Sequence, residues 1–478
     1  MFNELSFKYD LRIDDEMENF DFALQSHTQR LDKLITEFIE NWRIPGLSIA
    51  ISDESSTLYS KAFGVSNRKS GTPFRKSTIS GVASISKSLT ALTIYKLNST
   101  GRLSLTDRVK KYIPELALDT DENPVTIKQL LSHSTGIGSL NTTQIYLMQS
   151  MGKDTTNIQL KNFKDFIEHS RGAESQRFSP PDSRHLYWNE GYTILGEIIR
   201  RVSGMPYSTF AEEELLKPLG MKCSGFKISE LCPTANISSF YSGLAINQEK
   251  EVDFPQNELN YATGGLLSNI DDMSKYLRFW IKSNRKGEKT IQDWSFAGEA
   301  LKPRISKGIT NQFGLLSYGS GWEIFPDFFG ETMYQHPGDI YLCSSCISFL
   351  PDRNIGVVVL ANKGSIPQAM LTQPILALLL GRDPNRDFDY IRENSYIESI
   401  LGNYKDYRGY SDAEVYRKSG NLFLSITSDV SSFDLPVFYD QGEFYAILNS
   451  RKLNLRFVKH ENGIRELFFD RGKFVSLT

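Results

Sequence analysis

Strand-forming sequence lies at both ends of the main part of this chain, with helix-forming sequence between them. Residues 47–52 (LSIAIS) and 57–65 (TLYSKAFGV) flank a polar turn, which predicts a β-hairpin. Residues 316–362 alternate apolar runs with turns, which predicts a meander of about three or four antiparallel strands. Residues 84–280 are mainly helical in pattern. Because strands from both ends must share one core, we expect a mixed α/β (α+β) domain: an antiparallel sheet flanked by helices, with an all-α region inserted.

A charged stretch rich in helix breakers, GRDPNRDFD (381–389), ends this domain. After it, short alternating runs such as LFLSIT and EFYAILN are separated by turn signals about every ten residues, which predicts an all-β sandwich or small barrel. Of the two, we expect the barrel, of a lipocalin-like kind. The chain is therefore divided into an N-terminal arm at 1–26, a main domain at 27–385 and a C-terminal β-barrel domain at 386–478.

The charge of the chain limits its partners. The 54 Lys and Arg residues against 57 Asp and Glu residues give a net charge of −3. No excess of positive charge is present to neutralise a phosphate backbone or an anionic membrane surface, so we expect neither nucleic acid nor membrane as a partner. No apolar run reaches the roughly 20 residues that span a bilayer. The first residues lack the basic and apolar segments of a secretory signal, so we expect a cytoplasmic protein.

Cysteine and histidine spacing gives no sign of a metal centre. The four cysteines are too few and too unevenly spread to staple a chain of this size, and nothing about them demands an oxidising compartment. Cys343 and Cys346 fall in a predicted strand, where positions i and i+3 point to opposite faces, so we interpret them as ordinary apolar strand residues. The six histidines show no i, i+4 pairing, and no H-E-x-x-H occurs. We expect no metal and no organic cofactor.

The segment Ser84-Ile85-Ser86-Lys87 is the first candidate for chemistry. It precedes a run whose apolar residues nearly encircle a helix, so we expect a buried helix that opens with Ser84. Spacing i, i+3 places the Lys87 ammonium over the Ser84 hydroxyl. Serine is a poor nucleophile unless a base sits beside it, and a desolvated lysine is neutral enough to act as that base. S-x-x-K alone is a weak signal, because it also occurs at 66–69 and 283–286.

Two further motifs follow in order. Tyr187-Trp188-Asn189 is the Y-x-N of this chain, and a tyrosine in such a loop can relay protons where positive neighbours lower its pKa from about 10. His336-Pro337-Gly338 is the H-x-G, just before a predicted strand. The small Gly338 allows the strand edge to approach a substrate, and the N–H of Asp339 can complete an oxyanion hole with the N–H of Ser84.

With these motifs in this order, the chain resembles the penicillin-recognising serine hydrolases, which include class C β-lactamases, DD-peptidases, D-aminopeptidases and related esterases. The resemblance covers about residues 28–385 and implies a β-lactamase/transpeptidase-like fold. It implies that Ser84 is acylated, that Lys87 and Tyr187 handle its proton, and that Asn189 orients the substrate. The motifs that carry it are SISK (84–87), YWN (187–189) and HPGD (336–339).

One departure from the family pattern bears on the substrate. His336 stands where many β-lactamases and DD-peptidases have a lysine, and a histidine is a weaker fixed cation for a carboxylate. This difference counts against β-lactams as substrates. Because H-x-G occurs in D-amino-acid-specific peptidases of the superfamily, the resemblance implies a serine hydrolase that cleaves amide bonds in short or D-residue peptides, with a carboxylesterase, a β-lactamase or a non-catalytic assembly scaffold as alternatives. Some relatives also carry a C-terminal barrel, which in them contributes to assembly or covers the active site. A homo-oligomer is thus one expected state.

Overall fold

The structure of this chain is a computed structural model in which two units are distinguished. The first ends at Arg382 and the second is Asp383–Thr478. The N-terminal arm expected at 1–26 lies outside the described residues. The structure describes residues 28–118, 122–150, 158, 160–232, 236–241, 251–252, 254–284, 294–418, 421–440, 442–448, 450–470 and 472–477.

The first unit is built on one antiparallel sheet, with strand order β3-β2-β1-β13-β12-β11-β10-β9-β8 among the described residues. β1 (Gly46–Ser52) pairs with β2 (Thr57–Asn67) on one side and with β13 (Ile355–Ala361) on the other. Every residue of β1 and β13 is buried, as expected of short apolar strands at the centre of a sheet covered on both faces. The expectation that both ends of the domain share one sheet is confirmed.

The C-terminal part of the sheet is larger than the meander expected at 316–362. It begins with β8 (Ile305–Asn311), a mostly exposed edge strand whose polar residues give no clear strand signal. The other strands of the sheet are β3 (Thr72–Pro73), β9 (Gly314–Tyr318), β10 (Glu323–Phe328), β11 (Glu331–Asp339) and β12 (Ser344–Leu350).

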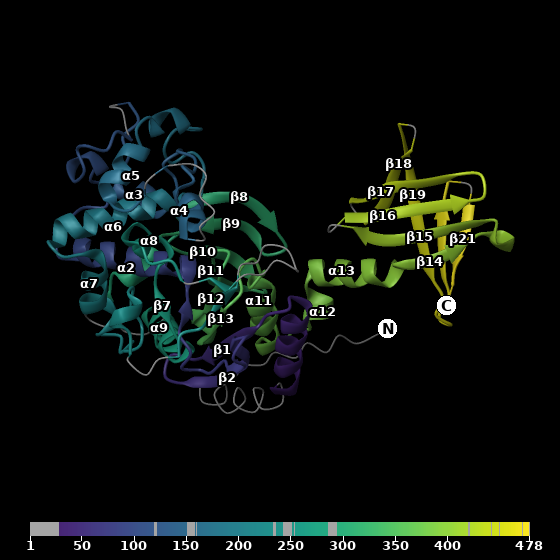
Figure 1. The fold of residues 1–478 in the computed structure, drawn as a ribbon, viewed down its shortest axis with the longest axis horizontal. Helices are drawn as coiled ribbons and strands as arrows, with labels where there is room; N and C mark the ends of the chain where they lie inside the picture. The colour runs from purple at the N-terminus through teal and green to yellow at the C-terminus, as the bar shows by residue number, and fades with distance from the viewer. Residues whose placement is uncertain are drawn as a thin grey trace, which may run out of the picture. The chain divides into compact units, whose positions relative to one another are not determined.

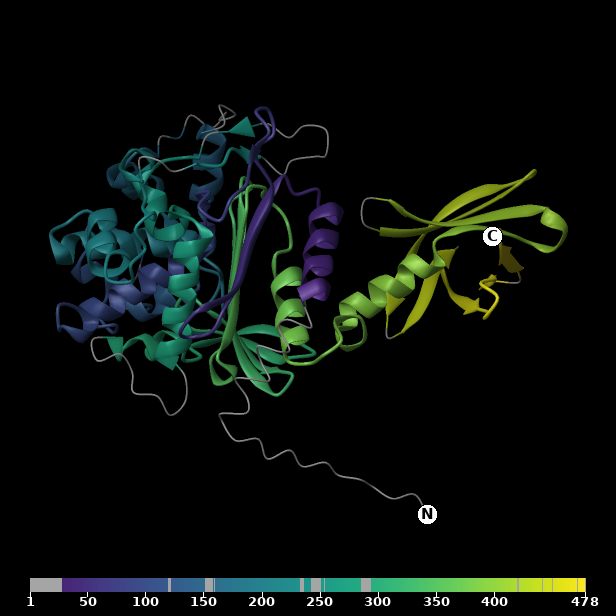
Figure 2. The ribbon, with the colours of Figure 1, turned by 90° about the horizontal axis from the view of Figure 1, so that it is seen from below.

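Helices cover both faces of the sheet (Figures 1 and 2). One face packs against α11 (Ala369–Leu379) and the helix at residues 28–41, which Figure 2 shows side by side. That first helix is bonded to β2, because Asp32 accepts hydrogen bonds from Tyr59 Oη at 2.6 Å and Lys61 Nζ at 2.8 Å. The other face packs against α9 (Ile270–Asn284), which contacts β1 and β13.

The helical region inserted after β2 surrounds α2 (Ser86–Ser99), of which Lys96, Asn98 and Ser99 alone are not buried. Two short strands join this region to the nucleophile segment, because β4 (Ser80–Gly81) pairs with β7 (Leu267–Ser268). The remaining helices of the region are α3 (Ile127–Leu131), α4 (Thr142–Ser150), α5 (Phe163–His169), α6 (Asn189–Ser203), α7 (Tyr207–Ala211), α8 (Glu258–Gly264) and α10 (Ala297–Ala300).

The second unit begins with α12 (Pro384–Asp387) and α13 (Asp389–Ile400) and continues as a closed barrel. Its core is formed by inward-facing residues such as Leu424, Ala446 and Leu467, which alternate with exposed ones along the strands. The expected all-β barrel is confirmed. Its strands are β14 (Gly402–Lys405), β15 (Ser411–Lys418), β16 (Asn421–Ser428), β17 (Ser432–Asp440), β18 (Glu443–Leu448), β19 (Arg451–Lys459), β20 (Arg465–Phe469) and β21 (Gly472–Ser476).

The cysteines divide into a bonded pair and a free pair. Cys223 and Cys232 form a disulfide, with 5.4 Å between their Cα atoms. The expectation that the cysteines form no disulfide framework is therefore wrong for the short loop between Cys223 and Cys232. Cys343 and Cys346 are free and buried, as interpreted from the strand pattern. In the described part of the chain, no helix is long and apolar enough to cross a membrane.

Candidate active site

Ser84 lies in a single 3-10 turn, Ala83–Ile85, directly before α2. The sequence predicted a helix that opens with Ser84 itself, whereas the regular helix begins at Ser86, after a 3-10 turn whose first residue, Ala83, has a positive φ of 47°. Hydrogen bonds hold the turn: Ser86 Oγ donates to the Ala83 carbonyl at 2.7 Å, and Val82 N donates to the Leu266 carbonyl at 3.0 Å. Ser84 thus lies on a turn that begins with a strained residue and is anchored by hydrogen bonds.

Lys87 is completely buried beneath this turn. Its Nζ donates to Ser84 Oγ at 3.1 Å and to the Thr263 carbonyl at 2.8 Å. Burial lowers the pKa of Lys87 well below its ordinary value, and the negative charge of Glu190 opposes part of that decrease. A lysine with a lowered pKa, in contact with a serine hydroxyl, can accept that serine's proton.

Tyr187 lies two residues before α6, facing the same two groups. Its ring centroid is 5.0 Å from Lys87 Nζ, and its hydroxyl forms a side-chain hydrogen bond with Ser84. Although 41% of Tyr187 is exposed, the hydroxyl end is enclosed by protein. Burial raises the pKa of Tyr187, and the bond with Ser84 lowers it only in part. The expectation that positive neighbours lower the pKa of Tyr187 is therefore wrong, because burial and the charge of Glu323 raise it and keep the phenol protonated.

His133 is hydrogen-bonded to both residues that flank Tyr187 in the chain. The His133 carbonyl accepts a hydrogen bond from Leu186 N at 2.8 Å, and its Nδ1 accepts one from Trp188 N at 3.0 Å, so both peptide neighbours of Tyr187 are bonded to one residue. The His133 and Tyr187 rings lie 4.3 Å apart between centroids. Burial, followed by the nearby His185 and Lys87, lowers the pKa of His133 and keeps Nδ1 free to accept.

His336 is buried in β11, on the opposite side of Tyr187. Its Nδ1 lies 2.7 Å from the Pro337 carbonyl, which can only accept, so Nδ1 carries the proton and Nε2 accepts from Tyr318 Oη at 2.9 Å. Burial and the charge of Lys87 lower the pKa of His336 to about 3, despite the opposing bond to Pro337. At neutral pH, this side chain is uncharged and has both nitrogens occupied.

The strand that carries His336 approaches the nucleophile at Gly338. A Cβ atom at Gly338 would lie 2.4 Å from Ser345 Oγ, 2.5 Å from the Val82 carbonyl and 3.0 Å from Ser84 N, so no larger residue fits without displacement. On the side of β10, pairing reaches only Gln335, because β10 begins at Glu323. Within the described part of the chain, no strand pairs with β11 beyond Gln335 on that side.

Of the residues expected from the sequence, the structure brings Ser84, Lys87 and Tyr187 into contact and places the His336 ring 6.4 Å from the Tyr187 ring. Asn189 is the first residue of α6. The sequence does not point to His185 or Tyr192. It favours a structural role for His133 and leaves Tyr318 open between pocket lining and plain packing, and the structure places the rings of all four around the site. The segment LLSHSTGI contains His133, but nothing in its spacing shows that it will meet a loop about fifty residues later.

Among the described residues, no cluster of three or more His, Cys, Asp or Glu side chains is arranged to hold a metal ion. Comparison with known families gives a match to the family described as Beta-lactamase over residues 31–381, which is most of the chain. The chain belongs to the beta-lactamase family. A second family, described as the Pab87 octamerisation domain, matches residues 384–475.

Individual proteins resemble this chain over shares of its length that range from 44% to 94%. The structure of the octameric penicillin-binding protein homologue from Pyrococcus abyssi is 30% identical, with a TM-score of 0.84, and the match covers 94% of this chain and 100% of that one. Protein flp of Staphylococcus aureus (strain MW2) is 26% identical over 79% of this chain and 70% of its own. Esterase EstB of Burkholderia gladioli is 27% identical over 44% of this chain and 54% of its own.

Proposed function

We propose that this chain is a serine hydrolase that forms an acyl-enzyme on Ser84. One observation carries the proposal: the fully buried Lys87 places its Nζ 3.1 Å from Ser84 Oγ. The distance is within hydrogen-bond range, and the lowered pKa makes the neutral amine available as a base. Proteins of the beta-lactamase family named above include an esterase, which supports hydrolysis as the reaction class.

In the proposed reaction, neutral Lys87 takes the Ser84 proton as Oγ bonds to the substrate carbonyl carbon. The N–H groups of Ser84 and Asp339 stabilise the oxyanion, and the Asn189 amide orients the substrate. The proton on Lys87 passes to the leaving group, with the neutral Tyr187 hydroxyl as relay, when the scissile bond breaks. A water molecule then attacks the ester carbonyl, gives a proton to Lys87 and releases the acid with Ser84 restored.

For the substrate, we propose short or D-residue peptides rather than β-lactams. A substrate carboxylate requires a fixed cation, and His336 offers none, because it is neutral and bonded to Tyr318 and Pro337. The enclosed position of His336 thus favours substrates that have no carboxylate next to the scissile bond. Both esters and internal peptide bonds are of this kind. The esterase alternative is favoured by the resemblance to Esterase EstB.

The acyl-enzyme is tested by intact-mass spectrometry after exposure to a fluorophosphonate. We expect one adduct on the wild-type chain and none on Ser84→Ala, whereas Ser99→Ala, which changes an exposed serine at the end of α2, should be labelled normally. An adduct that survives Ser84→Ala would refute the nucleophile. A panel of p-nitrophenyl esters, D-aminoacyl anilides and nitrocefin then separates esterase, peptidase and β-lactamase, and a non-catalytic scaffold would turn over none of them.

We also propose that the chain assembles as a homo-oligomer through its barrel unit. The match to an octamerisation domain at 384–475 supports this proposal, as do apolar side chains exposed on the same unit, such as Val430 and Ile447. Light scattering coupled to size-exclusion chromatography should give a mass several times 54.3 kDa. A monomer at micromolar concentration would refute the assembly.

We propose the cytoplasm as the compartment, and the Cys223–Cys232 pair provides the test. Stable disulfides are uncommon in cytosolic proteins of most organisms. Alkylation of thiols in intact cells, followed by mass spectrometry, should therefore find both cysteines modified if the protein resides there. A disulfide retained after alkylation would overturn the cytoplasmic assignment.

A further inference from the structure

The peptide that joins Gly338 to Asp339 supplies the second N–H of the proposed oxyanion hole, and Gln368 lies against its carbonyl. Gln368 is 5% exposed, and its Nε2 donates to the Gly338 carbonyl at 2.8 Å. We propose that Gln368 is a positioning residue, which holds this peptide plane so that the Asp339 N–H points at the carbonyl oxygen of the substrate. This inference rests on the proposed hydrolase function.

Strand pairing determines the direction in which this N–H points. Ile340 N donates to the Cys343 carbonyl at 3.3 Å, so these two residues are a hydrogen-bonded pair at the end of the ladder between β11 and β12. Such pairs alternate along an antiparallel ladder with pairs that share no hydrogen bond. Asp339, which lies opposite Ser344, is therefore in a pair of the second kind and turns its N–H away from β12. Within the described part of the chain, that is the side on which no strand pairs with β11 beyond Gln335.

The bond from Gln368 acts on the same peptide plane. In a trans peptide the C=O and N–H bonds point in opposite directions, so a bond that fixes the Gly338 carbonyl also fixes the Asp339 N–H. A carbonyl oxygen can only accept, so the Gln368 amide presents its nitrogen to it. The plane lies beside the nucleophile, because a Cβ atom at Gly338 would be 3.0 Å from Ser84 N. Loss of the bond would therefore let the peptide tilt at the point where the N–H must meet the oxyanion.

The segment that carries Gln368 also holds the Asp339 side chain. Gln368 is the N-cap residue of α11, which packs against β12 and β13. Three residues earlier, Ser365 N donates to Asp339 Oδ2. The same oxygen accepts from Ser344 Oγ at 2.6 Å, and Asp339 Oδ1 accepts from Tyr341 N at 2.8 Å. The segment 365–368 is thus hydrogen-bonded to both residues of the peptide.

Two esters that differ in one atom report on the oxyanion hole. O-(p-Nitrophenyl) thionobutyrate has a sulfur atom where p-nitrophenyl butyrate has the carbonyl oxygen, and sulfur is larger and a weaker hydrogen-bond acceptor. The ratio of the two kcat/KM values, oxygen ester over thionoester, is therefore high when the hole is well formed. Both values come from one sample, so any misfolded fraction cancels in the ratio, and the intrinsic difference in reactivity cancels between variants.

Gln368→Met keeps the length of the side chain and removes the donor. Loss of a whole oxyanion-hole donor lowers kcat by roughly 100- to 1000-fold. Because the Asp339 N–H is displaced and not lost, we expect kcat/KM for p-nitrophenyl butyrate to fall about tenfold, mainly through kcat, and the ratio to fall by a similar factor. Asp339→Asn replaces one acceptor oxygen with a donor and should lower the ratio in the same direction.

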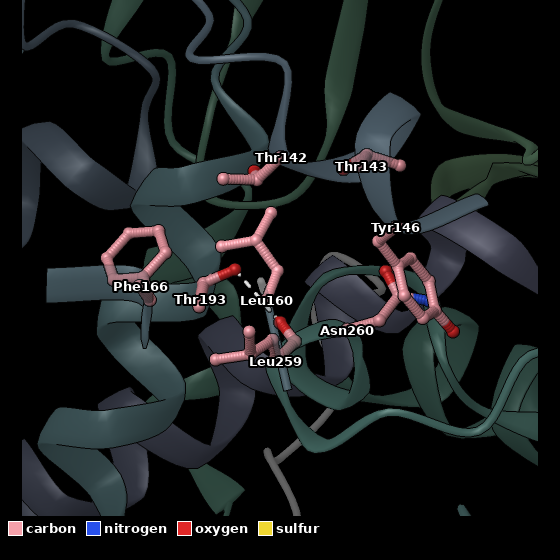
Figure 3. Close-up of a pocket in the computed structure, with 8 residues that line it drawn as sticks. All are labelled: Thr142, Thr143, Tyr146, Leu160, Phe166, Thr193, Leu259 and Asn260. Carbon is pink, nitrogen blue, oxygen red and sulfur yellow. Dashed lines mark hydrogen bonds between the residues drawn. The ribbon is translucent and has the colours of Figure 1, made fainter. Parts of the chain in front are cut away.

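Two variants that remove other buried side-chain donors serve as controls. Gln373→Met, on the same helix, removes the bond from Gln373 Nε2 to Gln335 Oε1 at 3.1 Å. Thr193→Val removes the bond from Thr193 Oγ1 to the Leu259 carbonyl at 2.9 Å, which joins α6 to α8 and is the dashed line in Figure 3. Neither bond involves the peptide between Gly338 and Asp339, so both variants should keep the wild-type ratio.

The outcomes separate this inference from the proposed function. A wild-type ratio in Gln368→Met would overturn the positioning role, and so would an equal fall of the ratio in the two controls. In both cases, fluorophosphonate labelling of Ser84 would leave the proposed function standing. If the wild-type chain hydrolyses neither ester and takes no fluorophosphonate label, the proposed function fails, and this inference falls with it.

Discussion

In this site, the protonation state of each titratable residue depends on its burial and its neighbours. Lys87 and Tyr187 contact the same serine, yet burial lowers the pKa of the lysine and raises that of the tyrosine, because it disfavours the charged form of each. Burial thereby favours the neutral form of both groups, which is the form that the proposed base and the proposed hydroxyl relay require. The S-x-x-K spacing identified the pair Ser84 and Lys87, but the protonation state of Tyr187 depends on surroundings contributed by other segments.

The charge of Glu190 provides a test of Lys87 as the base. Activity requires neutral Lys87, so kcat/KM should rise as pH increases through the lowered pKa of Lys87 and reach a plateau well below pH 10.5. Because the Glu190 charge raises that pKa, Glu190→Gln should move the acid limb of the pH profile to lower pH. The pH profiles of the wild type and Glu190→Gln are measured with an activated ester. If the acid limb of the variant moves to higher pH or does not move, the assignment of Lys87 as the base is contradicted.

His133 is expected to act as a positioning residue for Tyr187. His133→Ala removes the Nδ1 acceptor of Trp188 N, and a displacement of about 1 Å at the reacting groups costs roughly 100-fold, so kcat should fall by about that factor with KM little changed. His133→Asn should retain most activity, since asparagine tolerates the φ of 55° and its Oδ1 can replace Nδ1. Steady-state kinetics on folded variants decide, and near-normal kcat in His133→Ala would reject the role.

At the scale of elements, the site is assembled where a strand edge meets a helix start. The hairpin, the helical region and the later strands were predictable, since each has a local apolar pattern. The edge strand β8 was not, because its mostly exposed residues carry no such pattern. Nor was the 3-10 turn at Ala83–Ile85, which depends on bonds to Leu266, a residue distant in the chain.

The close approach of β11 to the nucleophile turn provides a prediction at this scale. Gly338→Ala places a methyl group against the Val82 carbonyl and Ser84 N, so β11 must move away, and we expect kcat/KM to fall at least 100-fold. Adding Ser345→Ala removes the Oγ atom that lies nearest to the new methyl group and should restore part of the activity. Wild-type kinetics in Gly338→Ala alone would show that this strand edge takes no part in the reaction.

For the whole molecule, the two units differ in how acid should affect them. In the first unit, His185 and His336 have pKa values lowered to about 4 and about 3, chiefly by burial, and that of His133 is also lowered. The barrel unit contains a single histidine, His460. A buried neutral histidine is protonated more readily after unfolding, so it favours unfolding as pH falls below about 6.5.

We therefore expect acid to destabilise the first unit selectively. Between pH 6.5 and pH 5, His336 alone should reduce the free energy of unfolding by about 2 kcal/mol, since the unfolded chain binds a proton that the folded chain does not. Urea unfolding followed at several pH values measures this slope. His185→Gln should make the slope shallower, whereas Ser99→Ala, at an exposed position without a titratable side chain, should not change it. Equal slopes in all three chains would contradict the argument.

The sequence by itself predicted the antiparallel sheet with its inserted helical region and the change to a barrel after residue 381, because apolar periodicity is a local property of a chain. Its motifs also resemble those of a family in which Ser84, Lys87 and Tyr187 would be the reacting residues. Only the tertiary structure decided the protonation states in the site, the clamp of His133 on the Tyr187 loop, the Cys223–Cys232 disulfide and the hydrogen bond from Gln368 to Gly338. Desolvation and most of these contacts arise between segments far apart in the chain, and no local pattern encodes them.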